Sequence, residues 1–391
     1  MQTTGERIAA HDDPMAWIEL LADDVGPRRP TGRAERLAAQ LVAERLRAAG
    51  AEARLEPFKG YPSFGLPFGL IMATAIAPSL LPARLRAVRS ALALAAGAGL
   101  ATEGSLVHAP LSRALSRWDS QNVVATIEPS GRVERTLCLM AHIDSSRSGL
   151  IFHPRLVGLL GRWITLNSAL VLAGAAGEPL LGGSAGGRRL LEGARQVLAG
   201  SLALLLEREL LGADVPGASD NASGCAVALS LAARIAAEPL ESTRVEILIT
   251  GCEESGTLGA QAFLRDRGTA DRLFLNFDNV GGGGTLRYLT REGVISHWNA
   301  DPGLIAVAAD VSRRRPELRF AAEDSPAGLT YDASPVLARG GRALTLSIQD
   351  GSIENLHWPT DTVTNVDPDG VARTFMAGAE MVAAIDRGEA G

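Results

Sequence analysis

The sequence predicts an α/β protein in which one mixed β-sheet is flanked by helices and carries an inserted helical subdomain of two apolar hairpins. Three observations support this. Short apolar runs alternate with helical patterns through the C-terminal half. Two segments rich in Leu, Ala and Gly interrupt the N-terminal half. The chain has 391 residues, of which 46% are hydrophobic, so it can bury a large core.

The N-terminal segment predicts two helices and a strand. Apolar residues recur at helical spacing over 17–21 and over 37–46, and a turn with Gly and Pro separates the two stretches. Gly50 ends the second helix, and residues 51–58 alternate as a strand does. Residues 1–14 hold His11 and two aspartates where a secretory signal would be cationic and apolar. We therefore expect no secretory signal, which leaves a cytoplasmic or a membrane-associated protein.

Further strands are predicted along the chain. Residues 122–127 and 136–140 flank a Pro-Ser-Gly turn and are predicted to form an antiparallel pair. Two more apolar runs, 245–250 and 273–277, predict buried strands that acidic residues follow. Helical patterns cover 222–237, 260–267 and 370–385. Because strands and helices alternate, one mixed sheet is expected.

Residues of metal-binding type stand where strands end. His142 follows a strand, and Asp144 is placed to accept the second N–H of this imidazole and fix its tautomer. Asp220 lies in a turn before a helix, where a carboxylate can bridge two cations. The same position also suits an ordinary helix N-cap, so both interpretations of Asp220 stay open.

Two adjacent carboxylates, Glu253 and Glu254, follow a buried strand. Such a pair repels itself inside a cleft unless a cation or a shared proton relieves it. One carboxylate can then bind zinc while the other takes a proton from a water molecule. Asp278 closes the next strand, and His357 lies in a later turn. Together with His142 and Asp220, these residues predict a two-zinc hydrolase site.

In this order the motifs resemble those of zinc-dependent aminopeptidases and glutamate-carboxypeptidase-like metallopeptidases with two co-catalytic metal ions. The resemblance rests on HxD at 142–144, GxxDNxSG at 217–224, EESGxxG at 253–259, the strand-ending Asp278 and HxxxDT at 357–362. The strand at 122–127 also fits. Apart from the two insertions, the resemblance covers nearly the whole chain.

The resemblance implies a role for each motif residue. Five residues would bind two zinc ions per chain, and Asp220 would bridge both ions. His142 and Asp278 would complete one zinc site, and Glu254 and His357 would complete the other. Glu253 would be the general base, Asp144 would support the first histidine, and Asp361 matches a position that supports the last one. The implied reaction is hydrolysis of a peptide or amino-acyl amide, and the implied protein is an exopeptidase, most simply an aminopeptidase.

One segment departs from the family pattern. Related proteins usually have an Asp-His pair near the end of the fold and often a tyrosine upstream of it. This chain keeps Asp332, lacks the histidine, and has Tyr331 directly beside the aspartate. Both residues are candidate substrate contacts. Tyr331 is either a displaced donor to the tetrahedral intermediate or a wall of the pocket.

The two apolar insertions divide the chain. The predicted parts are 1–60, the start of the catalytic domain; 61–119, the first insertion; 120–149, strands with the first metal ligand; 150–214, the second insertion; and 215–391, the remainder. Helices are expected over 64–81, 91–101, 156–176 and 197–206, and each falls short of the roughly 20 clean apolar residues of a membrane span. Strand direction predicts that both hairpins leave from the sheet edge that holds His142. They would form a lid, a membrane contact or a surface for self-association.

Composition narrows the partners. The formal charge of −6 and the absence of a Lys/Arg tract argue against nucleic acid. Cys138, Cys225 and Cys252 have no CxxC spacing and predict buried thiols. Two other functions compete with the peptidase. A catalytically silent membrane-associated or scaffold homologue should have lost a ligand or Glu253, and a single-zinc acyl-transfer or cyclising relative would need fewer ligands. The complete set favours hydrolysis with two metals.

Overall fold

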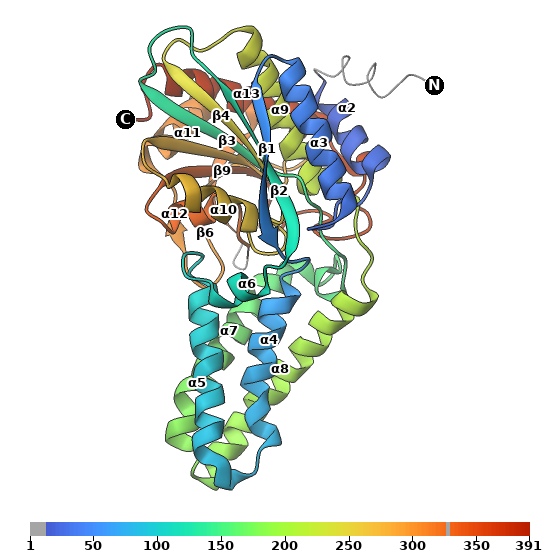
Figure 1. Cartoon of the computed structure of the whole chain (residues 1–391), viewed down its shortest axis with the longest axis vertical. Coiled ribbons are helices and arrows are strands. Elements are labelled where there is room, and N and C mark those ends of the chain that lie inside the picture. The colour runs from blue at the N-terminus through green and yellow to red at the C-terminus, as the bar shows by residue number, and fades with distance from the viewer. Residues whose placement is uncertain (1–12, 326–328) are drawn as a thin grey trace.

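The structure is a computed structural model that describes residues 13–325 and 329–391. Within these residues, nine strands form one mixed sheet in the order β1-β2-β4-β3-β5-β9-β6-β7, and β8 pairs with β6. Helices cover both faces of this sheet, and a long helical stalk projects from one of its edges (Figure 1). The predicted fold class is confirmed. His11 and most of the segment predicted to lack a signal lie outside the described residues.

The centre of the sheet is parallel. It consists of β4 (Thr243–Thr250), β3 (Arg135–His142), β5 (Arg272–Phe277) and β9 (Arg342–Ile348). On one side β2 (Trp118–Ile127) pairs antiparallel with β4, and β1 (Glu52–Gly60) pairs antiparallel with β2. On the other side β6 (Leu286–Glu292) is antiparallel to β9 and also pairs with β7 (Trp298–Asn299) and β8 (Phe320–Asp324). The parallel strands therefore end at one common edge.

The predicted pairing of β2 with β3 is wrong. The two strands do run in opposite directions, but β4 lies between them and bonds to both. The turn that joins β2 to β3 bonds to the segment leading into β4, since the amides of Ser130 and Gly131 donate to the carbonyls of Leu240 and Glu241. The short connection between β2 and β3 thus crosses over the position of β4, which follows about a hundred residues later in the sequence.

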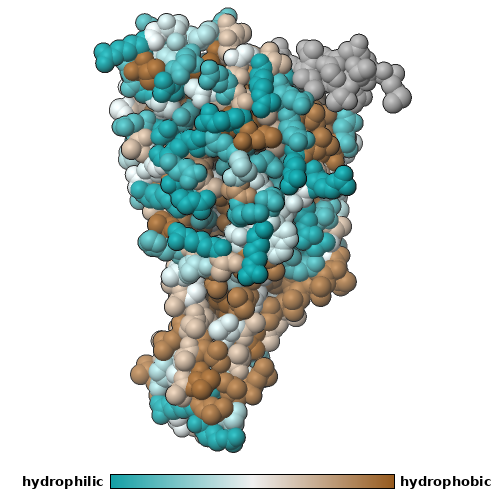
Figure 2. Space-filling model, in the orientation of Figure 1, coloured by the Kyte–Doolittle hydropathy of each residue, from teal (hydrophilic) through white to brown (hydrophobic). Residues whose placement is uncertain are grey.

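The two inserted segments form the stalk. The first contributes α4 (Gly65–Ile76) and α5 (Arg86–Glu103), the second contributes α7 (Leu160–Leu181) and α8 (Ala185–Leu211), and the short α6 (Pro110–Leu115) lies at the base (Figure 1). α5 packs on α7, and α4 packs on α8. Because β1 and β3 point the same way, both segments leave from the edge that holds His142, as predicted. Apolar side chains cover much of the stalk surface (Figure 2).

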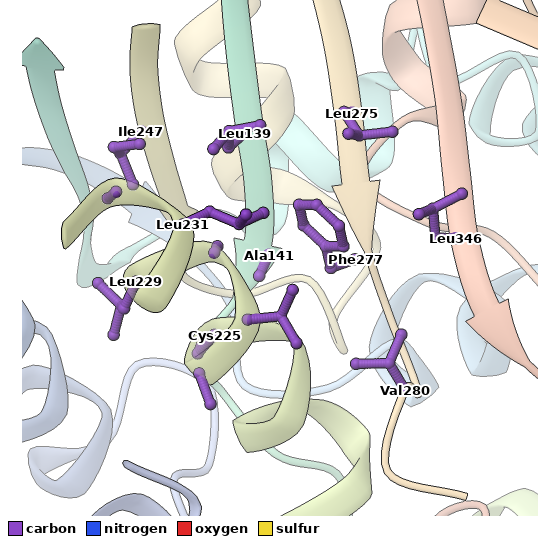
Figure 3. Close-up of a cluster of buried hydrophobic side chains, with 14 of the residues drawn as sticks. Leu139, Ala141, Cys225, Leu229, Leu231, Ile247, Leu275, Phe277, Val280 and Leu346 are labelled. Atoms are coloured by element: carbon purple, nitrogen blue, oxygen red, sulfur yellow. The ribbon is translucent and has the colours of Figure 1, made fainter. Parts of the chain in front are cut away.

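The remaining helices bury both faces of the sheet. One face packs against α2 (Pro14–Glu19), α3 (Arg33–Ala48), α9 (Gly224–Ala237), α11 (Pro302–Arg314) and α13 (Pro368–Asp386), and the other against α10 (Leu258–Arg267) and α12 (Ser334–Leu337). Residues alternate between the faces along β3, so that Leu139 and Ala141 meet α9 while Met140 packs on α10 (Figure 3). The three cysteines are buried and free, as predicted.

Candidate active site

Three of the five predicted ligands stand at the common edge of the parallel strands. His142 is the last residue of β3, Asp278 follows β5 directly, and Glu254 lies in the loop after β4. Open α/β sheets usually place their sites at this edge. Asp220 comes from the turn before α9, and His357 comes from the loop after β9. The backbone thus delivers all five residues to one place, from segments far apart in the sequence.

Asp220 stands between the two histidines. Its Oδ1 lies 3.1 Å from Nε2 of His142, and its Oδ2 lies 3.2 Å from Nε2 of His357. Asp278 Oδ2 is 3.5 Å from the same nitrogen of His142, and Glu254 Oε2 is 3.1 Å from that of His357. The ligand atoms of each group lie within 4.8 Å of one another. The structure therefore brings the five residues together as two groups of three that share Asp220.

This donor set fits two divalent cations. Imidazole nitrogens and carboxylate oxygens are zinc ligands, and all five side chains are buried. Within the described residues, Oε1 of Glu254 has no hydrogen-bond partner, which is costly for a buried carboxylate oxygen. Burial by itself lowers the pKa of His357, but Glu254 and Asp220 outweigh it and raise that pKa to about 9. A cation would replace the proton that these carboxylates hold on the imidazole.

Glu253 lies beside the two groups without belonging to either. Its side chain is buried and lines the same cavity as the five residues. Burial raises the pKa of its carboxyl well above the usual value, and neighbouring carboxylates add to the shift although His142 opposes it. A carboxyl with a raised pKa at a cavity wall is suited to accept a proton and return it near neutral pH.

Asp144 makes different contacts from those predicted. The hydrogen bond to Nδ1 of His142 is made by the backbone carbonyl of Asp144, at 3.0 Å, while the nearer carboxylate oxygen is 3.7 Å away. This bond fixes the tautomer that leaves Nε2 free for a metal. The carboxylate instead accepts from the backbone N–H groups of Glu253 and Glu254, at 3.1 and 3.0 Å. Asp144 thereby links the end of β3 to the loop after β4.

The turn around Asp220 is held by its neighbours. Asp220 has extended backbone angles, φ −113° and ψ 87°, and the N–H of Gly224 at the start of α9 donates to Asn221 Oδ1. The helix-cap interpretation of Asp220 is therefore wrong. Asp361 accepts from the N–H groups of Ser219 and Asp220, at 2.6 and 3.1 Å. It supports the shared aspartate, whereas the family resemblance implied support of the last histidine.

Two buried residues of the N-terminal segment also hold the site, and the sequence analysis missed both. Arg28 donates to the carbonyls of Ile143 and Pro216, at 2.7 Å each, and so joins the loop after β3 to the turn that carries the shared aspartate. Glu35 accepts from the backbone N–H of Cys252 at 3.0 Å. Cys252 has a left-handed backbone, with φ 55°, a conformation that persists only where the surroundings fix it.

Of the two predicted substrate contacts, Tyr331 lines the cavity that the ligands share. Asp332 is fully buried and is not among the residues that line this cavity. It accepts a hydrogen bond from the hydroxyl of Thr250 at the end of β4. Burial raises the pKa of Asp332 to about 7. The structure thus brings both residues to the site but exposes only one of them to the cavity.

Solved structures of zinc exopeptidases share this fold. BSAP, a zinc aminopeptidase from Bacillus subtilis, aligns over 95% of this chain and 94% of its own, with a TM-score of 0.57 and 14% sequence identity. An aminopeptidase from Aneurinibacillus sp. strain AM-1 covers 97% and 95%, with a TM-score of 0.55 and 14% identity. A glutaminyl cyclase from Porphyromonas gingivalis covers 95% and 96%, with a TM-score of 0.56 and 15% identity. The chain therefore has the fold of these zinc aminopeptidase and glutaminyl cyclase structures.

A family model matches the C-terminal part of the sequence. Residues 204–382, which include Asp220, Glu254, Asp278 and His357, match peptidase family M28. The match supports the resemblance seen in the motifs, which the shared fold also confirms. No curated protein sequence matches the chain.

Proposed function

We propose that this protein is a two-zinc exopeptidase, and specifically an aminopeptidase, that hydrolyses the amide bond of peptides or amino-acyl amides. The observation that carries the proposal is the pair of buried donor groups that share Asp220. The match of residues 204–382 to peptidase family M28 supports a peptide substrate. Two zinc ions, when bound, would supply Lewis-acid chemistry that activates water and polarises a carbonyl group.

The chain's own residues would then divide the work. In the proposal five residues hold the ions, namely His142, Asp220, Glu254, Asp278 and His357. Glu253 accepts a proton from the attacking water and returns it to the leaving amine. Asp144 positions Glu253 through the backbone hydrogen bond between them. Tyr331 forms part of the substrate cavity, and Asp332 supports the end of β4.

We also propose that the predicted division of the chain holds. Residues 1–60, 120–149 and 215–391 would form the catalytic domain, and residues 61–119 and 150–214 would form one inserted unit. The support is a separate hydrophobic core in the stalk, made by residues from α4, α5, α7 and α8, which include Ile71, Leu100, Val171 and Leu198.

The test is to measure zinc content and hydrolysis together. Wild type, Glu253→Gln and the exposed control Glu238→Gln are assayed on amino-acyl amides, dipeptides and a peptide with N-terminal glutamine. We expect about two zinc ions per chain in all three proteins. Activity should fall roughly 10²- to 10⁴-fold in Glu253→Gln only, because the variant keeps the ligands and loses the base.

Three results would contradict this proposal. Retention of activity in Glu253→Gln removes the assigned base. A metal-free and inactive wild type supports the silent homologue. One zinc per chain together with cyclisation of N-terminal glutamine identifies the cyclising relative, a type of activity represented among the solved structures by the glutaminyl cyclase.

A further inference from the structure

A cavity joins the metal-binding residues to the interior of the stalk. Its volume is about 250 Å³, and its walls include the five ligand residues and side chains from α4, α5, α7 and α8. Along α7 the lining runs from Leu160 to Val171, a distance of about 16 Å at the α-helical rise. The active site thus continues into a channel inside the helical bundle.

The stalk part of this wall is apolar. Aromatic and aliphatic side chains such as Phe68, Ile71 and Trp163 make up most of it. Few polar groups line it, and most of them already have partners. Asn167 donates to the carbonyl of Trp163, and Ser201 donates to that of Val197. Glu103 accepts from the hydroxyl of Ser112, which leaves Oδ1 of Asn167 as a buried acceptor without a partner among the described residues. The wall within the stalk therefore offers a ligand contact surface and very little hydrogen bonding.

Such a wall selects against an extended peptide. Every peptide unit carries an N–H and a C=O that need partners when they are buried. An alkyl chain needs none and gains from leaving water along its whole length. An apolar cavity of about 150 Å³ accommodates benzene, so this larger cavity exceeds the needs of one ordinary side chain.

This inference rests on the amide hydrolysis of the proposed function and changes its substrate: we propose that a fatty N-acyl amide takes the place of an amino-acyl amide. The acyl carbonyl would lie at the ligand residues, and the alkyl chain would extend into the stalk toward Val171. Hydrolysis breaks the C–N bond, the water oxygen joins the acyl carbon, and the amine leaves with a proton. The products are a fatty acid and an amine, and no oxidant or reductant is needed.

The first test measures hydrolysis of 4-nitroanilides of acetic, butyric, octanoic and dodecanoic acid and of leucine. We expect kcat/KM to rise up to roughly fourfold per methylene until the chain fills the cavity. Val171→Trp should lower kcat/KM for the dodecanoyl substrate at least about tenfold more than for the acetyl substrate. Leu172→Trp is the matched control, because Leu172 is the next residue on α7 and is 44% exposed.

A binding measurement separates this inference from the proposed function. Calorimetry with dodecanoate is carried out on Glu253→Gln, with and without Val171→Trp or Ser201→Leu, a second filling variant on α8. Binding that both filling variants abolish supports the alkyl-chain site in the stalk. If no anilide is cleaved in that case, the hydrolysis that both proposals share is overturned and the binding site alone stands. Cleavage of the leucine substrate without a chain-length effect or dodecanoate binding keeps the peptidase and overturns the fatty-acyl inference.

The outer surface of the stalk carries a second, independent feature. In Figure 2 apolar residues cover the stalk below a hydrophilic catalytic body, and the tip is hydrophilic again. Among the described residues, all but two of the exposed large hydrophobic side chains lie in the two inserted segments; the exceptions are Leu37 and Met376. Exposed apolar surface on this scale marks an interaction site.

We infer that a lipid bilayer covers this surface. Exposed leucines occur on all four helices, for example Leu70, Leu94, Leu172 and Leu206. A symmetric interface with a second copy uses one patch of the surface, whereas lipid surrounds a bundle on every side. The sequence predicted no span because a charged residue, Arg162, interrupts the apolar run. By overall length and composition, however, the segment Val157–Leu181 is the one described helix that can cross a membrane.

Charge supports the same partner. No charged residue occurs in 90–102 of α5, 163–177 of α7 or 196–206 of α8, which corresponds to stretches of about 16 to 22 Å. Exposed Arg84, Arg86 and Arg189 follow at the tip, where they suit anionic headgroups. The hydrocarbon core is about 30 Å thick, so the flexible stems of these arginines would cover the remainder.

Flotation with vesicles of phosphatidylcholine and phosphatidylglycerol tests this inference. Wild type should float with the vesicles, and the combined variant Leu94→Lys, Leu172→Lys, Leu206→Lys should not. The control variant Leu37→Lys, Met376→Lys changes exposed apolar residues of the catalytic body and should float like wild type. The inference is overturned if the wild-type protein does not float with the vesicles. This holds whether the protein stays monomeric or forms a concentration-dependent dimer that the stalk variant abolishes.

Discussion

At the scale of single residues, buried charges outside the motifs hold the ligand loops in place. Arg28 donates to five backbone carbonyls, which belong to Leu21, Gly26, Ile143, Pro216 and Gly217. Burial lowers the pKa of its guanidinium, and nearby acidic groups oppose this shift. Its hydrogen bonds join segments that are more than a hundred residues apart, so the geometry of the donor groups depends on a residue that binds no metal.

The buried Glu292 is expected to make the stability of the fold depend on pH. It is buried and accepts from Ser334 and Thr345, at 2.7 and 3.0 Å. Burial raises its pKa from 4.5 to about 7, although both hydrogen bonds oppose the shift. Between these values the folded protein keeps a proton that the unfolded chain has lost, so stability falls as pH rises. The slope from this group is about 1.4 kcal/mol per pH unit.

Glu292→Gln should remove this contribution. The free energy of unfolding from urea titrations should fall less steeply with pH than in wild type, and the gap should widen from pH 5 to pH 7 and then level off. Exposed Glu44→Gln is the control and should follow the wild-type curve. Parallel curves for wild type and Glu292→Gln would show that Glu292 does not titrate in this range.

At the scale of elements, one buried carboxylate joins three helices of the stalk. Glu178 of α7 is fully buried and bonds to Arg89 of α5, at 2.8 Å, and to Arg195 of α8. Glu178→Ala would remove the shared buried carboxylate and leave Arg89 with the carbonyl of Leu81 and Arg195 with the partly exposed Glu192. We expect a loss of about 3 to 5 kcal/mol in the stability of the stalk, measured by helix unfolding in detergent with circular dichroism.

Glu192→Ala is the matched control for this change. Glu192 also bonds to Arg195, at 3.4 Å, but its side chain is 42% exposed. An exposed pair of this kind contributes about 0 to 1 kcal/mol. If the two variants lose the same stability, the buried contact of Glu178 does not hold the helices together.

The elements also show what the sequence can predict. The strands that end near ligands were found because apolar runs lead to His142, Glu254 and Asp278. The sequence did not predict that β2 pairs with β4, because this pairing depends on the position of β4 between β2 and β3. No local sequence pattern indicates that position. Arg28 was missed for a related reason. It is buried while its neighbour Arg29 is partly exposed, and the turn sequence does not distinguish them.

At the scale of the whole molecule, all five predicted ligands belong to the catalytic body and none belongs to the stalk. They come from segments between His142 and His357, and none lies in α4, α5, α7 or α8. Without cations, Asp220, Asp278 and Glu254 stand close together as buried carboxylates. Metal binding would therefore stabilise the body of the protein directly.

Chelation tests this asymmetry. Each zinc ion at a thousand times its dissociation constant adds about 4 kcal/mol, so removing zinc should lower the Tm of the catalytic body by on the order of 10 °C in calorimetry. Glu253→Gln should show the same shift, because it keeps the ligands, and His357→Ala should show a smaller one. A Tm that does not change when the chelator is added would mean that the donor groups hold no ion. The stalk transition should stay in place throughout, since its helices contribute no ligand.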